Sequence, residues 1–217
     1  MSRASAQGAR SPATVDLDSL IAECLVAART ASPGEAVRDV LARALYAGIR
    51  LRSKGAASHQ RVAILHLSDE LTVLHVVITP AAVFLPHDHG LWAATALLTG
   101  REDNVFYRRE GRRVVQGGGR RQEAGELLLT GPEVIHSLSN PGRTPSASIR
   151  VFGGDLTAVP RWQWSPPTYE ASPLDPGRLA ANIALRPWPC GVAVLASGSG
   201  QQSASRLRRP PPDGSAL

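Results

Sequence analysis

The sequence predicts a mainly β protein, a jelly-roll barrel preceded by two N-terminal helices, in a chain of 217 residues. Two observations carry this prediction. Residues 17–49 place apolar side chains three and four positions apart, which is the spacing of amphipathic helices. Between residues 61 and 156, short runs rich in Val, Ile, Leu and Thr alternate with Gly, Pro and Asp, which is typical of many short antiparallel strands.

The helical region divides into two helices at Ser32-Pro33-Gly34-Glu35. Serine is a favoured N-cap, proline fits the first helical turn, and a glutamate three positions after the cap completes a capping box. Apolar stripes lie on both sides of this boundary. They are Leu20, Ile21, Cys24, Leu25 and Ala28 in the first helix, and Ala36, Val37, Val40, Leu41, Ala44 and Leu45 in the second. We expect both stripes to pack on the outside of the barrel.

Turns within residues 61–156 are expected at glycines and polar clusters. Glu110-Gly111-Arg112 and the glycine run Gln116-Gly117-Gly118-Gly119 are interpreted as hairpin loops. Glu102-Asp103-Asn104, which follows Gly100, is also assigned to a hairpin turn. A contact between one of these three residues and a functional site is the less favoured alternative.

The sequence Leu85-Pro86-His87-Asp88-His89-Gly90 contains the strongest functional signal. Successive side chains of a strand point to opposite faces, so His87 and His89 share one face and Asp88 points away. Two neutral imidazoles on one strand suit a first-row transition metal. His136, at the start of a later strand, is a candidate third ligand. A metal-free barrel with coincidental histidine spacing is the alternative.

These histidines lie in two motifs that resemble those of the cupin family, whose fold is a double-stranded β-helix. Residues that match the motifs are His87, His89 and Gly100 in the first, and Gly125, His136 and Asn140 in the second; Gly131 and Glu133 replace the usual Pro and Gly of the second. The resemblance implies the cupin barrel and a metal held by the three histidines. The glutamate of the first motif would fall near Ala93 or Ala94, so we expect a site of three histidines without a carboxylate.

Three-histidine cupins resemble the thiol dioxygenases, which are cysteine dioxygenase and its relatives. The resemblance is to the bacterial branch, covers residues 17–178, and is most specific between residues 79 and 155. It implies non-haem Fe(2+), dioxygen as a co-substrate and a thiol that is oxidised to a sulfinate. The chemistry of the three ligands also favours a thiol substrate. Three neutral imidazoles leave the charge of a bound dication uncompensated, so an anionic donor such as a thiolate is favoured.

The family also carries a Ser-x-His-x-Tyr triad and an arginine for the substrate carboxylate. In Ser148-Ile149-Arg150-Val151-Phe152 the serine matches, whereas arginine replaces histidine and phenylalanine replaces tyrosine. Strand alternation puts Ser148, Arg150 and Phe152 on one face. Ser148 and Arg150 are the candidate catalytic residues, and Arg150, Phe152 and Arg61 are the candidate substrate-binding residues. The alternatives are a surface position for Arg61 and an exposed sheet face for Arg150.

The resemblance and the composition together define the domain organisation. Residues 16–188 are expected to form one cupin domain, with helices in 17–49, the barrel in 61–156 and a Pro-rich wrapping segment in 157–188. The composition of residues 1–15 and 189–217 predicts a disordered leader and tail.

Charge and composition exclude several classes of function. The net charge is +6, but the arginines are dispersed and no nucleic-acid-binding motif is present. No apolar run is long enough to span a membrane, and no signal peptide is evident. The two cysteines, Cys24 and Cys190, do not suggest a disulfide framework. We expect a cytoplasmic monomer or homodimer that binds neither nucleic acid nor membrane.

These observations predict a non-haem iron(II)-dependent dioxygenase that oxidises a small carboxylate-bearing thiol to its sulfinate. One alternative is a three-histidine cupin that catalyses a different oxidative or isomerising step in a biosynthetic pathway. Another is a cupin that binds a ligand without catalysis. The partners expected in the first case are dioxygen and the small-molecule substrate.

Overall fold

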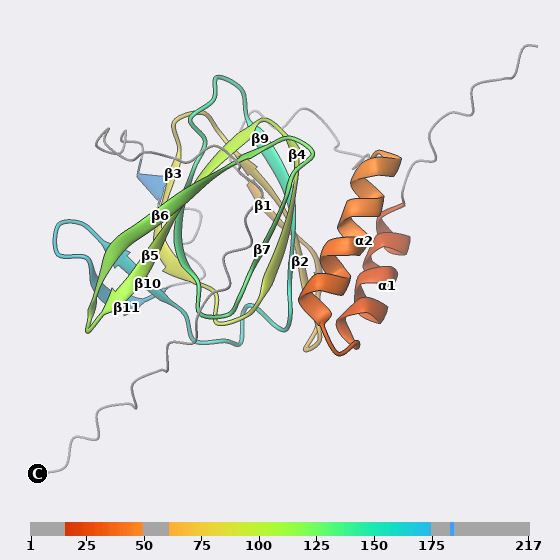
Figure 1. The fold of residues 1–217 in the computed structure, drawn as a ribbon, viewed down its shortest axis with the longest axis horizontal. Coiled ribbons are helices and arrows are strands. Elements are labelled where there is room, and N and C mark those ends of the chain that lie inside the picture. The colour runs from red at the N-terminus through yellow and green to blue at the C-terminus, as the bar shows by residue number, and fades with distance from the viewer. Residues whose placement is uncertain (1–15, 50–60, 175–182, 185–217) are drawn as a thin grey trace, which may run out of the picture.

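The computed structural model describes residues 16–49, 61–174 and 183–184; for residues 61, 183 and 184 it describes the backbone only. The leader expected at 1–15, the tail expected at 189–217 and most of residues 175–188 lie outside the described residues. Two helices precede a set of antiparallel strands that form two sheets (Figure 1). The predicted mainly β class with two N-terminal helices is therefore confirmed.

The helices are α1 (Leu17–Ala28) and α2 (Pro33–Ala47). The Asp16 side chain caps α1 by accepting a hydrogen bond from the backbone N–H of Ser19 at 3.4 Å. α2 begins at Pro33, as the sequence predicted, but the Ser32 side chain makes no capping hydrogen bond. The expected capping box is therefore absent, although the helix boundary is correct. Gly48 ends α2 with φ at 84°, a left-handed conformation that glycine adopts without strain.

The strands are divided between two sheets. The five-stranded sheet has the order β1 (Arg61–Leu67), β2 (Thr72–Ile78), β9 (Ser146–Phe152), β4 (Ala93–Thr99) and β7 (Leu127–Thr130). The seven-stranded sheet has the order β10 (Trp162–Ser165), β11 (Glu170–Pro173), β6 (Arg113–Glu123), β5 (Arg101–Glu110), β8 (Ile135–Ser139), β3 (Val83–Asp88) and β12 (Ile183–Ala184). β10 also pairs with β3. The two sheets face each other as the walls of a barrel (Figure 1).

Apolar side chains form a core on each side of the five-stranded sheet. On the outer side, α1 and α2 pack against β4, β9 and the start of β2. The buried residues there include Leu20 and Leu41 from the helices and Ile149 from β9. The expected packing of both helix stripes on the outside of the barrel is confirmed. On the inner side, a second cluster that includes Val76, Phe84 and Leu138 fills part of the barrel interior.

Two expected loops are strand residues in the structure. β5 and β6 form one long hairpin, with its turn at the predicted Glu110-Gly111-Arg112. The interpretation of Gln116-Gly117-Gly118-Gly119 as a loop was wrong, because these residues lie inside β6. Phe106 pairs with Gly118 and Tyr107 with Gln116, so Gly117 is the extra residue of a β-bulge. The turn expected at Glu102-Asp103-Asn104 was also wrong, since these residues lie in β5.

Neither helix in the described part of the chain has the length and apolarity needed to cross a lipid bilayer.

Candidate metal centre

The three predicted histidine ligands converge inside the barrel. His87 lies in β3, His89 follows the last residue of that strand, and His136 lies in β8 directly opposite His87. One ring nitrogen from each histidine lies within 4.8 Å of those from the other two. All three side chains are buried, and His136 is only 4% exposed. Antiparallel pairing of β3 with β8 therefore brings together residues that are far apart in the sequence.

Hydrogen bonds on the Nδ1 side orient two of the rings. His87 Nδ1 lies 2.8 Å from the carbonyl oxygen of Leu85, and His136 Nδ1 lies 3.0 Å from Oδ1 of Asn104. Because each partner is an acceptor, the proton resides on Nδ1 and the lone pair on Nε2. Metal-bound histidines in proteins are oriented by such bonds.

The donor set fits a metal ion. Nε2 of His136 is buried and has no hydrogen-bond partner among the described residues. A buried polar atom without a partner is uncommon and calls for a physical explanation. Its lone pair points into the space that it shares with His87 and His89, so coordination to a cation would satisfy it. The absence of a carboxylate from this group within the described chain agrees with the sequence prediction, and Ala93 lines the cavity beside it.

Burial keeps the three imidazoles neutral. Desolvation lowers the pKa of His87 to about 4, and the positive charge of Arg150 acts in the same direction. Desolvation also lowers the pKa of His89 and of His136 well below the usual value. A neutral imidazole is the form that binds a metal, so the site is ready for coordination at neutral pH without losing protons first.

The metal-free protein is expected to lose stability as the pH falls from about 6.5 to about 4. An unfolded histidine takes up a proton near pH 6.5, whereas His87 in the folded protein does so only at a pKa of about 4. The unfolded state therefore binds more protons in this interval, and the free energy of unfolding decreases as pH is lowered. Urea denaturation at pH 6.5 and pH 5 in the presence of a chelator measures this effect. If the free energy of unfolding decreases as much in the His89→Phe variant, the effect does not come from the buried histidines of the cluster.

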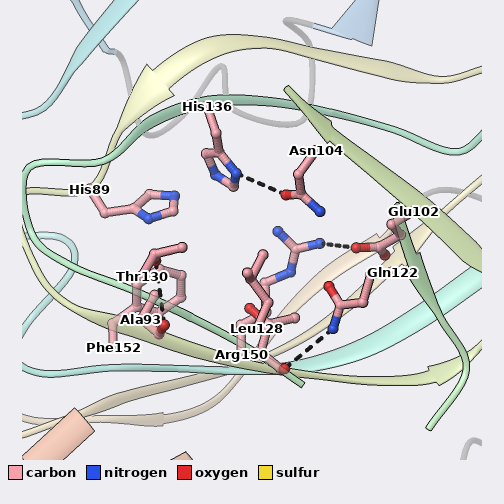
Figure 2. Close-up of a pocket in the computed structure, with 11 residues that line it drawn as sticks. His89, Ala93, Glu102, Asn104, Gln122, Leu128, Thr130, His136, Arg150 and Phe152 are labelled. Carbon is pink, nitrogen blue, oxygen red and sulfur yellow. Dashed lines mark hydrogen bonds and ion pairs between the residues drawn. The ribbon is translucent and has the colours of Figure 1, made fainter. Parts of the chain in front are cut away.

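A polar cavity lies next to His89 and His136. Its polar lining consists of Thr95, Glu102, Asn104, Gln122, Thr130 and Arg150 in addition to the two histidines. Figure 2 shows the Arg150 guanidinium between Glu102 and the histidines, with Asn104 bonded to His136. The sequence analysis did not select Gln122, and it gave a site contact by Glu102 or Asn104 only as the less favoured alternative to a turn. Alternation along β5 was a signal for two of them, because Glu102 and Asn104 are two positions apart and share a face.

Arg150 is held by a buried network. Its Nη2 donates to Oε2 of Glu102 at 2.9 Å, and its Nε donates to Oγ of Ser148 at 3.1 Å. The other carboxylate oxygen of Glu102 accepts a hydrogen bond from Ser146 at 3.0 Å. Arg150 thus lies inside the barrel beside the histidines and not on an exposed sheet face, and Ser148 is buried and bonded to it. The chain's own Glu102 balances the charge of Arg150.

The other predicted substrate residues have different positions. The Phe152 ring is perpendicular to the His89 ring with the centroids 5.0 Å apart, so it borders the metal centre. Arg61 is the first residue of β1 and pairs with Val77 of β2. Its side chain lies outside the described part of the structure, so its role stays a prediction.

A second cavity, which shares His89, Arg150 and Phe152 with the first, is mainly apolar. Its apolar lining consists of Val62, Leu74, Val76, Phe84, Leu138, Phe152 and Leu156. His87 and His89 border it, and two arginines complete the lining, Arg150 and Arg161. Arg161 lies outside the predicted site residues, in the segment that the sequence assigned to wrapping the barrel.

The hydrogen bond from His136 to Asn104 predicts a measurable effect of Asn104 on metal affinity. Replacing Asn104 with leucine removes the acceptor for Nδ1 of His136. Loss of such an outer hydrogen bond weakens metal binding by roughly 10- to 100-fold. A competitive zinc titration measures the change. Gln122→Leu is the matched control, because Gln122 is a buried amide of the same cavity that bonds to Thr95 and Glu126 and not to a histidine. Equal affinities of the two variants would contradict the role of Asn104.

Among known proteins, only solved structures resemble this chain; comparisons by sequence found no match. No protein-family model matches the chain, and no curated protein matches its sequence. An RmlC-like cupin family protein with a double-stranded β-helix fold from Methanocaldococcus jannaschii is 10% identical, with a TM-score of 0.41 over 50% of this chain and 90% of that chain. Oxalate oxidase in complex with the substrate analogue glycolate is 18% identical, with a TM-score of 0.39 over 48% of this chain and 57% of that chain.

A third structure is a conserved protein with a double-stranded β-helix domain from Klebsiella pneumoniae. It is 12% identical, with a TM-score of 0.35 over 60% of this chain and 94% of that chain. Two of the three descriptions name a double-stranded β-helix. At these identities the likeness concerns the fold, and those activities belong to those proteins.

Proposed function

We propose that this protein is a non-haem iron(II)-dependent dioxygenase that oxidises a small carboxylate-bearing thiol to its sulfinate. The observation that supports the proposal is the group of three buried histidines with no carboxylate among them. Such a group leaves the charge of a bound dication uncompensated, so an anionic and soft donor such as a thiolate is favoured as the next ligand. Thiolate and dioxygen are the two reactants that this arrangement accommodates best.

The overall reaction is balanced without a further reductant. The O–O bond breaks, two S–O bonds form, sulfur is oxidised and oxygen is reduced. Iron(II), when bound, supplies the redox chemistry that connects dioxygen to sulfur. His87, His89 and His136 would hold it through the nitrogens that converge in the barrel.

The remaining residues of the site bind and orient the substrate. Arg150, positioned by Ser148 and Glu102, places a fixed dipole and hydrogen-bond donors beside the histidines. Phe152 covers one side of His89 and excludes water there. A positive charge near the sulfur favours the thiolate over the thiol, because it stabilises the anion.

A second candidate function follows from Phe152. The thiol dioxygenase triad would have a tyrosine hydroxyl at this position, and a benzyl ring cannot donate a proton. This observation favours a metal-dependent oxidative or isomerising reaction on a different small substrate, or ligand binding without turnover, as the second candidate.

Oxygen consumption separates these candidates. The iron(II)-reconstituted protein is assayed with cysteine, 3-mercaptopropionate and other small thiols, and sulfinate is identified by mass spectrometry. We expect thiol-dependent oxygen uptake that is lost in His87→Ala and kept in His66→Ala, because His66 bonds to Ser68 and is outside the cluster. Iron bound at one per chain with no uptake on any thiol would overturn the dioxygenase proposal and favour the second candidate.

A further inference from the structure

Arg161 is a buried cation that the proposed metal chemistry does not use. Its side chain is 6% exposed and lines the apolar cavity beside His87 and His89. No hydrogen bond or ion pair to its guanidinium is found within the described part of the chain. A buried charge without a partner is costly in free energy, so such groups are normally paired. This guanidinium therefore has capacity for an anion that the described residues do not supply.

The backbone of Arg161 is fixed in place next to the metal centre. β10 begins at the next residue and pairs with β3 where Gln163 opposes His87. The backbone N–H of Trp162 donates to Oδ1 of Asp88 at 2.7 Å, and the carbonyl of Arg161 accepts a hydrogen bond from the N–H of Leu174 at 2.8 Å. The position of the Arg161 backbone is thus determined by the fold, and its side chain lines the cavity.

Among the described residues that line this cavity, Arg161 is the arginine without a carboxylate in an ion pair. Arg150, the other arginine there, forms an ion pair with Glu102. Asp88 attracts Arg161 through space, but this carboxylate already accepts the Trp162 N–H and lies 3.8 Å from Arg109. Arg161 lines the cavity together with His87 and His89, and its positive charge contributes to the lowered pKa of both histidines.

We propose that the apolar cavity binds a small carboxylate with a short hydrocarbon body, anchored by Arg161 and directed toward His87 and His89. The guanidinium offers two parallel N–H donors that match a carboxylate. Val76, Leu138 and neighbouring apolar side chains would contact the hydrocarbon part. The inference rests on the proposed function only in treating this ligand as the substrate. It assigns to Arg161 the carboxylate contact that the sequence analysis assigned to Arg150 or Arg61.

The experiment measures ligand binding without catalysis. The zinc-loaded protein, in which the metal is not redox-active, is titrated with acetate, butanoate and butanamide and followed by NMR. We expect butanoate to bind more tightly than acetate by about fourfold per buried methylene. We expect butanamide, which has the same size and no charge, to bind at least about 10-fold more weakly than butanoate.

Variants of Arg161 test whether its guanidinium binds the carboxylate of the ligand. Arg161→Gln is expected to weaken butanoate binding by about 10-fold or more and to leave butanamide binding nearly unchanged. Arg161→Lys, which keeps the charge but not the paired donors, is expected to be intermediate. Arg38→Gln is the control, because Arg38 lies on α2 and pairs with the exposed Asp39. Thermal melting shows whether each variant is folded. If Arg161→Gln does not fold, Arg161→Lys serves as the test.

Three results would overturn the inference. They are unchanged butanoate binding in the folded Arg161 variants, equal affinities for acetate and butanoate, and loss of butanoate binding on zinc removal with no dependence on Arg161. Failure of the proposed function is distinguishable, since thiol-dependent oxygen uptake and Arg161-dependent butanoate binding are separate measurements. Arg161-dependent binding without oxygen uptake supports the carboxylate site and contradicts the dioxygenase.

Discussion

Replacing His136 with alanine is expected to weaken metal binding by more than about 100-fold, the upper end of the effect of losing only an outer hydrogen bond. The reason is geometric. A ring nitrogen of His136 lies within 4.8 Å of those of His87 and His89, and no carboxylate of the described residues belongs to this group. Removal of this ring leaves two nitrogens from one strand and opens the coordination sphere to water.

Calorimetric titration of the chelator-treated protein with zinc measures this change. His66→Ala is the matched control, because His66 is a partly buried histidine that bonds to Ser68 outside the cluster. We expect His136→Ala to keep its secondary structure by circular dichroism. Zinc binding by folded His136→Ala with the affinity of the unmodified protein would show that the metal is held elsewhere.

Replacing Glu102 with alanine is expected to destabilise the protein by about 3–5 kcal/mol, the cost of breaking a buried ion pair by removing one partner. Glu102 is 1% exposed and accepts hydrogen bonds from Arg150 and Ser146. Without it, the Arg150 guanidinium stays buried with Ser148 as its remaining partner in the described chain. The charge then has no anion to balance it.

Urea denaturation compares this variant with a variant of an exposed ion pair. Arg29 contacts both carboxylate oxygens of Glu70 at 2.6 and 2.7 Å, but both side chains are exposed. Glu70→Ala is therefore expected to cost much less stability than Glu102→Ala, because exposed ion pairs contribute little. Similar losses of stability in Glu102→Ala and Glu70→Ala would mean that the buried network contributes no more than a surface ion pair.

The parts of the fold that local patterns determine could be predicted from the sequence. Amphipathic spacing located both helices, and the Pro33 boundary was correct because proline fits the first turn of a helix. His87 and His89 share a face because they are two positions apart on a strand. His136 was found through motif spacing, and its meeting with His87 depends on the β3–β8 pairing.

The parts of the site that depend on strand register could not be predicted in this way. The run Gln116–Gly119 resembles a turn locally, but the β5–β6 pairing continues through it and accommodates Gly117 as a bulge. Extension of β5 through this pairing places Glu102 and Asn104 beside the histidines. Arg161 was missed for a related reason, because its position follows from the docking of β10 on β3.

X-ray absorption spectroscopy of the iron(II)-loaded protein tests the metal centre most directly. The spectrum reports which atoms surround the metal and at what distance. Three imidazole nitrogens are expected in the first coordination shell, with the remaining positions filled by water in the resting protein and by sulfur after a small thiol is added. A shell with fewer than two imidazoles, or one with protein carboxylate in place of His136, would contradict the three-histidine centre on which the proposed function depends.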